Sequence, residues 1–134
     1  FIINDTECVL NLVKNPTGAN EVMKVIEADD RRKCVLIVLN DHEQDGTDVS
    51  WIYDTHFEKF IDPQTKMVIC TGTRAYDMAL RMKYEGYAGD LRVITDLQQA
   101  VDELSAQKDF VLYAIATYTA LLPTRNAIVR RLEK

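Results

Sequence analysis

Cys34-Val35-Leu36-Ile37-Val38-Leu39 is a short apolar run that contains β-branched residues and leads directly into polar Asn40. Such a run predicts a strand that is buried on both faces of a sheet. Four more runs of this kind occur along the chain, at residues 8–13, 67–71, 91–94 and 110–114. The sequence therefore predicts at least five buried strands.

Segments with helical spacing separate these strands, at residues 19–28, 75–85 and 97–105 and in a terminal stretch that reaches Leu132. Asp96 is placed to cap the third helix and Gly86 to end the second, whereas Pro123 predicts a kink or a restart in the last one. Strands that alternate with helices predict an α/β fold. We expect a Rossmann-like three-layer domain, with a mostly parallel sheet of about five or six strands flanked by helices.

Composition limits the classes of function. The chain has 134 residues, of which 47% are hydrophobic, so one domain can form a core without disulfides or metal. A formal net charge of -5 would repel nucleic acid, and the apolar runs are too short to cross a bilayer, so we expect a soluble cytoplasmic domain without a transmembrane segment.

Cysteine and histidine spacing gives no sign of a metal site. Cys8, Cys34 and Cys70 each lie in or beside a predicted strand, which predicts buried free thiols. The cysteines lack zinc-knuckle spacing, and the histidines lie far apart, so we predict no metal in this chain.

The chain begins with Phe rather than Met, and we expect it to be a fragment of a longer protein.

The loop at residues 40–54 is the first candidate for function. It is long for a strand-to-helix connection and holds four aspartates, a glutamate and the only tryptophan. Its carboxylates could orient a histidine, hold magnesium, cap the next helix, or simply surround a solvated turn at Asp45-Gly46. Trp51, Ile52 and Tyr53 favour a docking surface, because an apolar patch in an acidic loop must bury itself against the domain or a partner.

Two other turns follow predicted strands. Lys14 and Asn15 lie where a helix is about to begin, and a lysine beside helix N-terminal amides suits a phosphate, although an Asn-Pro turn with a solvated lysine explains the same residues. At Gly72-Thr73-Arg74 a structural turn is the simpler interpretation than an anion site. The chain contains neither a G-x-x-x-x-G-K-[ST] nor a G-x-G-x-x-G motif, so the usual means of binding ATP alone is missing.

Four strings, in one order, resemble the C-terminal domain of MurT-like proteins in the Mur ligase family. They are LVKNPTGANEV at residues 12–22, DGTDVSWIYD at residues 45–54, GTRAYDMALR at residues 72–81 and YTALL at residues 118–122. The first string differs from the Asp-Tyr-Ala-His-Asn-Pro pattern of amino-acid-adding Mur ligases before Asn15-Pro16, which favours the MurT branch.

The resemblance implies a function for the longer protein. Residues 1–134 would form a single Mur-ligase-type C-terminal domain, inactive alone, of a carbon–nitrogen ligase of the EC 6.3.5 type. MurT-like proteins amidate the D-glutamate α-carboxylate of lipid II at the inner face of the bacterial membrane during peptidoglycan synthesis. ATP and Mg²⁺ would bind mainly to the central domain, which is absent here, and ammonia would come from a GatD-like glutaminase subunit.

The resemblance also implies roles for individual residues. The C-terminal domain of this family supplies the aspartate of a split Cys-His-Asp triad to the glutaminase, and we place Asp48 first and Asp45 second for this role. Lys14 and Asn15 would face ATP. The residues expected at the partner interface are Asp41, Trp51, Tyr53 and Asp54.

Two other classes of function fit the same sequence. The chain could be the C-terminal domain of an amino-acid-adding Mur or folylpolyglutamate-type ligase, which needs no glutaminase. It could also be a noncatalytic docking module, in which the acidic loop only binds a partner.

Overall fold

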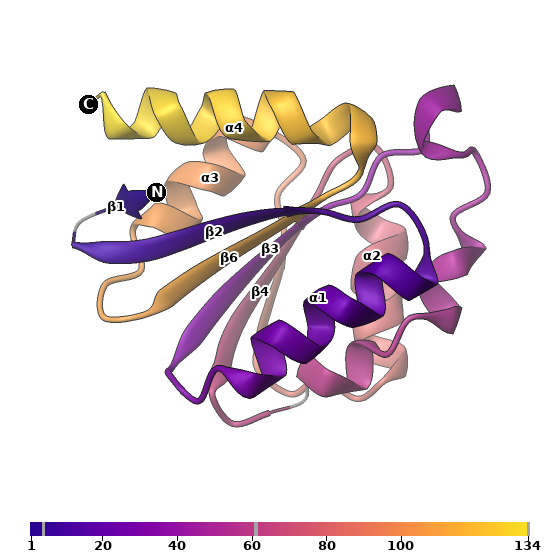
Figure 1. Ribbon diagram of the computed structural model, residues 1–134, viewed down its shortest axis with the longest axis horizontal. Helices are drawn as coiled ribbons and strands as arrows, with labels where there is room; N and C mark the ends of the chain where they lie inside the picture. The colour runs from indigo at the N-terminus through magenta and orange to yellow at the C-terminus, as the bar shows by residue number, and fades with distance from the viewer. Residues whose placement is uncertain (4, 61, 134) are drawn as a thin grey trace.

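A six-stranded sheet forms the centre of the computed structural model, which describes residues 1–3, 5–60 and 62–133 (Figure 1). The strands are β1 (Ile2–Ile3), β2 (Thr6–Leu12), β3 (Lys33–Val38), β4 (Thr65–Thr71), β5 (Asp90–Val93) and β6 (Val111–Ala116). The helices are α1 (Pro16–Ala28), α2 (Ala75–Tyr84), α3 (Leu97–Ser105) and α4 (Tyr118–Leu132), and three 3-10 helices, η1 (Glu43–Asp45), η2 (Ser50–Asp54) and η3 (Phe57–Phe60), follow β3.

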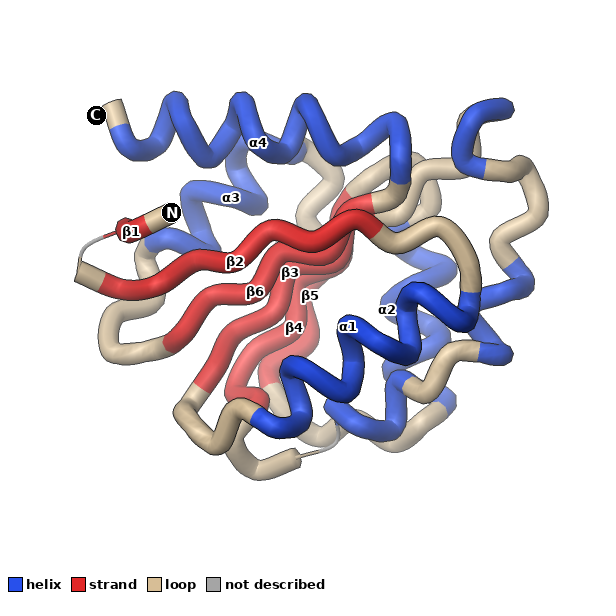
Figure 2. The backbone as a smooth tube through the Cα atoms, in the orientation of Figure 1, coloured by secondary structure: helices blue, strands red, loops and turns tan. Residues whose placement is uncertain are grey.

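The strand order is β1-β2-β6-β3-β4-β5, and only the β1–β2 pair is antiparallel. Buried residues of α1 and α2 pack on one face of the sheet and those of α3 and α4 on the other, which gives three layers (Figures 1 and 2). Strands β3 and β6 are buried at every position, as their unbroken apolar sequences require. The predicted fold class is confirmed.

The chain reverses its direction of travel across the sheet at β3 and β6. From β3 it continues outward to β4 and β5, then returns to insert β6 between β2 and β3. Val38 and Ala116 are register partners at the ends of these two strands. Ligands of doubly wound sheets gather at such a reversal, beyond the carboxyl ends of the strands, so the loops that follow β3 and β6 come together where a site is expected.

Several local predictions are confirmed. The Asp96 side chain accepts a hydrogen bond from the Gln98 amide at the start of α3, and Gly86 follows α2 with a φ of 82°. Of the two outcomes expected at Pro123, a restart does not occur, because α4 includes this residue in one helix, and the kink stays a prediction. Pro123 removes one amide donor, and the buried residues Ala120 and Ala127 on either side hold the helix against the sheet.

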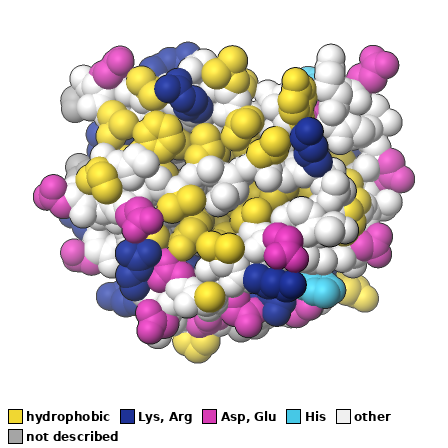
Figure 3. Space-filling view, viewed as in Figure 1, with side chains coloured by type: hydrophobic (Ala, Val, Ile, Leu, Met, Phe, Trp, Pro, Cys, Tyr) yellow, Lys and Arg dark blue, Asp and Glu magenta, His cyan; other side chains and the backbone are white. Residues whose placement is uncertain are grey.

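The surface above the β2 edge carries an apolar patch. Figure 3 shows hydrophobic side chains gathered across the middle of the molecule, between α4 and α1. Leu122 of α4 and Val25 of α1 are among the exposed hydrophobic residues of these two helices.

Within the described ranges, none of the helices has the length and the apolar composition that crossing a membrane requires.

Candidate functional site

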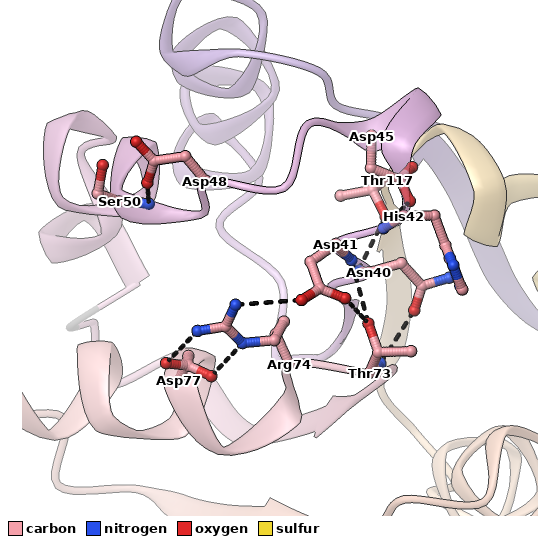
Figure 4. A network of polar contacts seen from close by, with 10 residues as sticks. All are labelled: Asn40, Asp41, His42, Asp45, Asp48, Ser50, Thr73, Arg74, Asp77 and Thr117. Carbon is pink, nitrogen blue, oxygen red and sulfur yellow. Dashed lines mark hydrogen bonds and ion pairs between the residues drawn. The ribbon is translucent and has the colours of Figure 1, made fainter.

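Asn40 connects three loops at the carboxyl end of the sheet. Its amide donates to Thr117 Oγ1 at 3.1 Å, and its Oδ1 accepts from the Thr73 amide at 3.0 Å (Figure 4). Its Nδ2 donates to Thr119 Oγ1 at 3.1 Å. Since Thr73 follows β4 and both Thr117 and Thr119 follow β6, the backbone amide and the side chain of this one residue fix the loop after β3 to both neighbouring connections.

Asp41 lies inside a charged network. Its Oδ1 accepts from Thr73 Oγ1 at 2.8 Å, and its Oδ2 accepts from Arg74 Nη1 at 3.1 Å. Arg74 also contacts both oxygens of Asp77, at 2.7 and 3.0 Å (Figure 4). The hydrogen bonds from Thr73 and then Arg74 hold the pKa of Asp41 below its usual range, and Arg74 does the same for Asp77. Arg74 is therefore engaged within the chain, which agrees with a structural turn at this position.

Asp45 fastens the loop to the beginning of α4. Its carboxylate accepts from the Thr119 amide at 2.7 Å and from Thr119 Oγ1, and it also accepts from the His42 amide at 3.2 Å. Thr119 lies in the first turn of α4, where amides lack partners within the helix and a negative charge is favoured. Asp45 thus acts as a helix cap supplied from a distant part of the chain.

Asp48 has a different environment, although only two residues separate it from Asp45. Its side chain is exposed, and its Oδ1 accepts a 2.9 Å hydrogen bond from the Ser50 amide. Hydrogen bonding from Ser50 holds the pKa of Asp48 below its usual range, so the carboxylate is charged at neutral pH. Figure 4 shows Asp48 and Ser50 apart from the network around Arg74. Asp48 lines a surface hollow of about 260 Å³.

We call residues 40–46 the anchored segment and residues 47–54 the presented segment. In the presented segment, Ile52 is buried, Trp51 packs partly buried against the core, and Tyr53 is 48% exposed. Asp54 is exposed. Tyr53 and Asp54 are thus accessible to a partner, whereas much of Trp51 already packs inside the domain. The interface role predicted for Asp41, Trp51, Tyr53 and Asp54 stays a prediction.

Arg81 of α2 contacts the presented segment from its buried side. Its side chain is buried, and the whole residue is 2% exposed. Its Nε donates to the carbonyl of Ile52 and its Nη2 to that of Thr55, both at 2.9 Å, and Nη1 pairs with Glu85 at 2.6 Å. A buried guanidinium whose donors are used by backbone oxygens and a carboxylate fixes the path of the segment.

The two residues predicted to face ATP have separate roles. Asn15 Oδ1 accepts from the Gly18 amide at 2.8 Å and caps α1, with Pro16 as the first helical residue. Lys14 is exposed, and its Nζ lies 5.5 Å from the centre of the Tyr118 ring. Lys14 and Tyr118 border a pocket of about 430 Å³ that Asp45 also lines.

The predicted free thiols are confirmed. Cys8, Cys34 and Cys70 are all unpaired and buried. Burial raises the pKa of Cys8 and Cys34 to about 11 and that of Cys70 to about 12, so these thiols are poor nucleophiles. In the described part of the chain, no three His, Cys, Asp or Glu side chains are grouped so that they could hold a metal ion.

Residues 12–121 match the family described as MurT ligase C-terminal. The chain belongs to this family. Two relatives, from Staphylococcus aureus strain COL and Streptococcus pneumoniae, are each named "Lipid II isoglutaminyl synthase (glutamine-hydrolyzing) subunit MurT". They are 39% and 33% identical to this MurT-family domain over 95% and 98% of its length. The domain spans only 29% and 30% of the length of these relatives.

Solved structures of Mur ligases share the fold of this MurT-family domain. UDP-N-acetylmuramate-alanine ligase MurC from Thermotoga maritima superposes with a TM-score of 0.61 at 8% identity, covering 99% of this chain and 28% of that one. A domain described as part of a UDP-N-acetylmuramate ligase from Haemophilus ducreyi gives 0.60 at 11% identity, covering 98% and 95%. At such low identity the likeness shows the fold alone.

Sequence reasoning missed three residues that shape the site of the MurT-family domain, Asn40, Arg81 and Thr119. Arg81 lies in an amphipathic helix, where an arginine is normally expected on the solvent side. Its position could have been noticed, since Met78 and Met82 flank it on the buried face of α2. The partner of Asp45 gave no comparable signal, because Thr119 is 74 residues away.

Proposed function

We propose that this domain is the C-terminal part of a lipid II isoglutaminyl synthase subunit, and that it supplies Asp48 to the active site of a separate glutaminase subunit. In this proposal the full-length protein uses ATP and Mg²⁺ to activate the D-glutamate α-carboxylate of lipid II at the cytoplasmic face of the membrane. Ammonia from the glutaminase then forms the amide. The names of the two relatives support the ligase and the hydrolysis of glutamine.

The observation that carries the proposal is the exposed, charged carboxylate of Asp48, in a segment whose backbone path is fixed by a hydrogen bond from the buried Arg81 side chain to the Ile52 carbonyl. A glutaminase needs a cysteine thiolate and a histidine to attack the side-chain amide of glutamine. A carboxylate that accepts the second ring N–H of that histidine selects the productive tautomer and stabilises the imidazolium. Asp48 can accept such a bond, whereas the oxygens of Asp45 already serve the start of α4.

The nucleotide side of the proposal rests on Lys14. An exposed ammonium group beside the Tyr118 ring, at the rim of a pocket of about 430 Å³, suits one phosphate or the edge of a nucleotide. Asn15, Arg74 and the Thr73 amide are used within the chain. We therefore propose that Lys14 contributes a single contact and that the central domain holds most of the ATP and the Mg²⁺.

The decisive test is Asp48→Asn in the full-length protein, assembled with its glutaminase subunit. We expect the complex to form normally on gel filtration and glutamine hydrolysis to fall by roughly 10³- to 10⁴-fold, as when the aspartate of a serine-protease triad is changed to asparagine. Asp30→Asn makes the same chemical change at an exposed position near the end of α1 and serves as the matched control.

The outcomes separate the three functions that the sequence allows. If the complex that carries Asp48→Asn assembles and keeps full glutaminase activity, the acidic loop serves only to bind the partner. A full-length protein that binds no glutaminase, and that couples an amino acid rather than ammonia to its substrate, would favour the amino-acid-adding ligase.

A further inference from the structure

Three large apolar side chains lie exposed along one side of α2. Tyr76, Leu80 and Tyr84 are 71%, 59% and 76% exposed, and their spacing of four residues places them on one face of the helix. We call these three residues the α2 stripe. The opposite face of α2 buries Met78 and Met82 in the core. A surface helix normally presents polar residues to water, so the stripe needs an explanation.

The stripe is continuous with the presented segment. The ring of Tyr53 meets the ring of Tyr84 edge to face, with 6.0 Å between centroids. The buried Arg81 guanidinium lies 5.4 Å from the Tyr53 ring and 6.0 Å from the Tyr84 ring. The same guanidinium bonds the carbonyl of Ile52 within the presented segment and that of Thr55 just after it, so the stripe and Asp48 belong to one preorganised surface.

A surface hollow lies on either side of α2. The hollow of about 260 Å³ is lined by Asp48 and Tyr53 from the loop and by Asp77 from α2. A second one, of about 420 Å³, lies between α2 and the edge strand β5, and its lining residues are Tyr76, Ala79, Leu80, Lys83, Leu91 and Val93. Arg74, which is paired with Asp77, also lines the first hollow, so this hollow is polar and, among the described residues, Asp48 is its unpaired carboxylate. The stripe thus has a polar hollow on one side and, on the other, an apolar groove that Tyr76 and Leu80 help to form.

The two ends of the chain lie away from the α2 stripe. Strand β5 is one edge of the sheet, and β1 with Phe1 beside it forms the other edge. Figure 1 shows both ends of the chain on the left of the molecule and α2 on the right. The pocket beside Lys14 and Tyr118 also has Asp45 and Gly46 in its lining, so it adjoins the anchored segment rather than α2. Asp48 and Tyr53 line one hollow with Asp77 of α2, and Tyr53 contacts Tyr84, so a molecule that binds at Asp48 comes close to the α2 stripe.

We propose that the α2 stripe is the docking surface for the glutaminase subunit, whose histidine reaches Asp48, an inference that rests on the proposed function. An aromatic and leucine ridge next to a charged carboxylate matches the usual anatomy of an interface, in which apolar anchors surround a small number of polar contacts. The partner surface is accordingly apolar where it covers Tyr76 and Leu80, and it presents its imidazole beside Asp48.

The test compares the loss of two stripe residues with the loss of an exposed leucine on another helix. In the full-length protein, Tyr76→Ser with Leu80→Ser removes two members of the stripe, and Leu122→Ser on α4, where the leucine is 63% exposed, is the control. The dissociation constant for the purified glutaminase subunit is measured by titration calorimetry, and melting curves confirm the fold of each variant. We expect the stripe variant to weaken binding at least ten-fold and the control to bind like the wild type.

Glutamine hydrolysis at saturating partner completes the experiment. We expect the stripe variant to recover most of its activity there, because Asp48 is intact, whereas Asp48→Asn binds normally and stays inactive. A stripe variant that binds as tightly as the wild type would overturn the docking surface and leave the proposed function standing. A wild-type protein that binds no glutaminase would instead overturn the proposed function, and the docking surface with it.

Discussion

Asp45 and Asp48 come from the same acidic loop, yet the anchored and presented segments treat them in opposite ways. Asp45 accepts three hydrogen bonds from Thr119 and His42. Asp48 accepts from Ser50, its near neighbour, and remains exposed. Composition alone makes the two residues equivalent, and their partners decide which one holds the loop and which one is offered to another molecule.

The two segments also differ in the contacts that hold them in place. Asn40 and Asp45 tie the anchored segment to the connections after β4 and β6. Arg81 supports the presented segment through the carbonyl of Ile52 and through that of Thr55, which follows the segment. These contacts leave the side chains of Asp48 and Tyr53 accessible. Support through the backbone lets a segment be rigid and still present its side chains.

The largest expected effect separates the two aspartates in activity. With the glutaminase present at saturation, Asp48→Asn should lower the kcat for glutamine hydrolysis roughly 10³-fold more than Asp45→Asn does, since only Asp48 is proposed to act on the histidine. Steady-state kinetics of the two assembled complexes measures the difference. Equal losses in both variants would mean that the loop acts as a unit and that our division of it is wrong.

Removal of Arg81 should loosen the presented segment. Arg81→Met keeps the length of the side chain and leaves the carbonyls of Ile52 and Thr55 without their buried donor. We expect the free energy of unfolding to fall by about 3 kcal/mol, the usual cost of stranding buried polar groups. Urea denaturation measures this, and Arg125→Met, at an exposed arginine of α4, should change stability by less than about 0.5 kcal/mol.

A smaller effect is expected where the anchored segment meets α4. Asp45→Ala removes the carboxylate that caps this helix and should lower the free energy of unfolding by about 1 kcal/mol. Thermal melting followed by circular dichroism detects such a change. If Asp30→Ala, at an exposed site, were equally costly, the bond to Thr119 would not be the reason.

The smallest expected effect is on the stability of the fold at acidic pH. The pKa values of Asp41 and Asp77 are lowered, chiefly by Thr73 for the first and by Arg74 for the second. A lowered pKa in the folded state stabilises the protein above the unfolded value, which is about 3.9 for aspartate, and this stabilisation is lost as the pH falls through the folded value. Arg74→Met should therefore flatten the fall in stability below about pH 4. Melting temperatures from pH 6 to pH 2.5 test this, and unchanged slopes would contradict it.

The sequence predicted the fold well because its signals are local. Five apolar runs became the strands β2 to β6 with small shifts at their ends, such as β6, which continues to Ala116. Strand β1 was missed because two residues, Ile2 and Ile3, are too few to show a pattern. The restart considered at Pro123 does not occur, because buried residues on both sides of it hold α4 together as one helix.

The site was less predictable because its bonds join distant residues. The acidic loop was recognised as exceptional, but nothing in it shows that Asp45 binds Thr119 or that Arg81 turns inward. Asn15 was predicted to face a nucleotide, which stays a prediction, and its part in capping α1 was not foreseen. The ranking of Asp48 before Asp45 came from the place of Asp48 in the matching string, beside apolar residues that could contact a partner, and it stays a prediction.

The bond between Asp45 and Thr119 also sets an order of events during synthesis. The two residues are 74 positions apart, so the acidic loop leaves the ribosome well before the residue that fastens it. At about 5–20 residues per second, the interval is on the order of several seconds. The nascent chain cannot complete this attachment until α4 begins to emerge, which delays a finished loop until translation of the domain is nearly over.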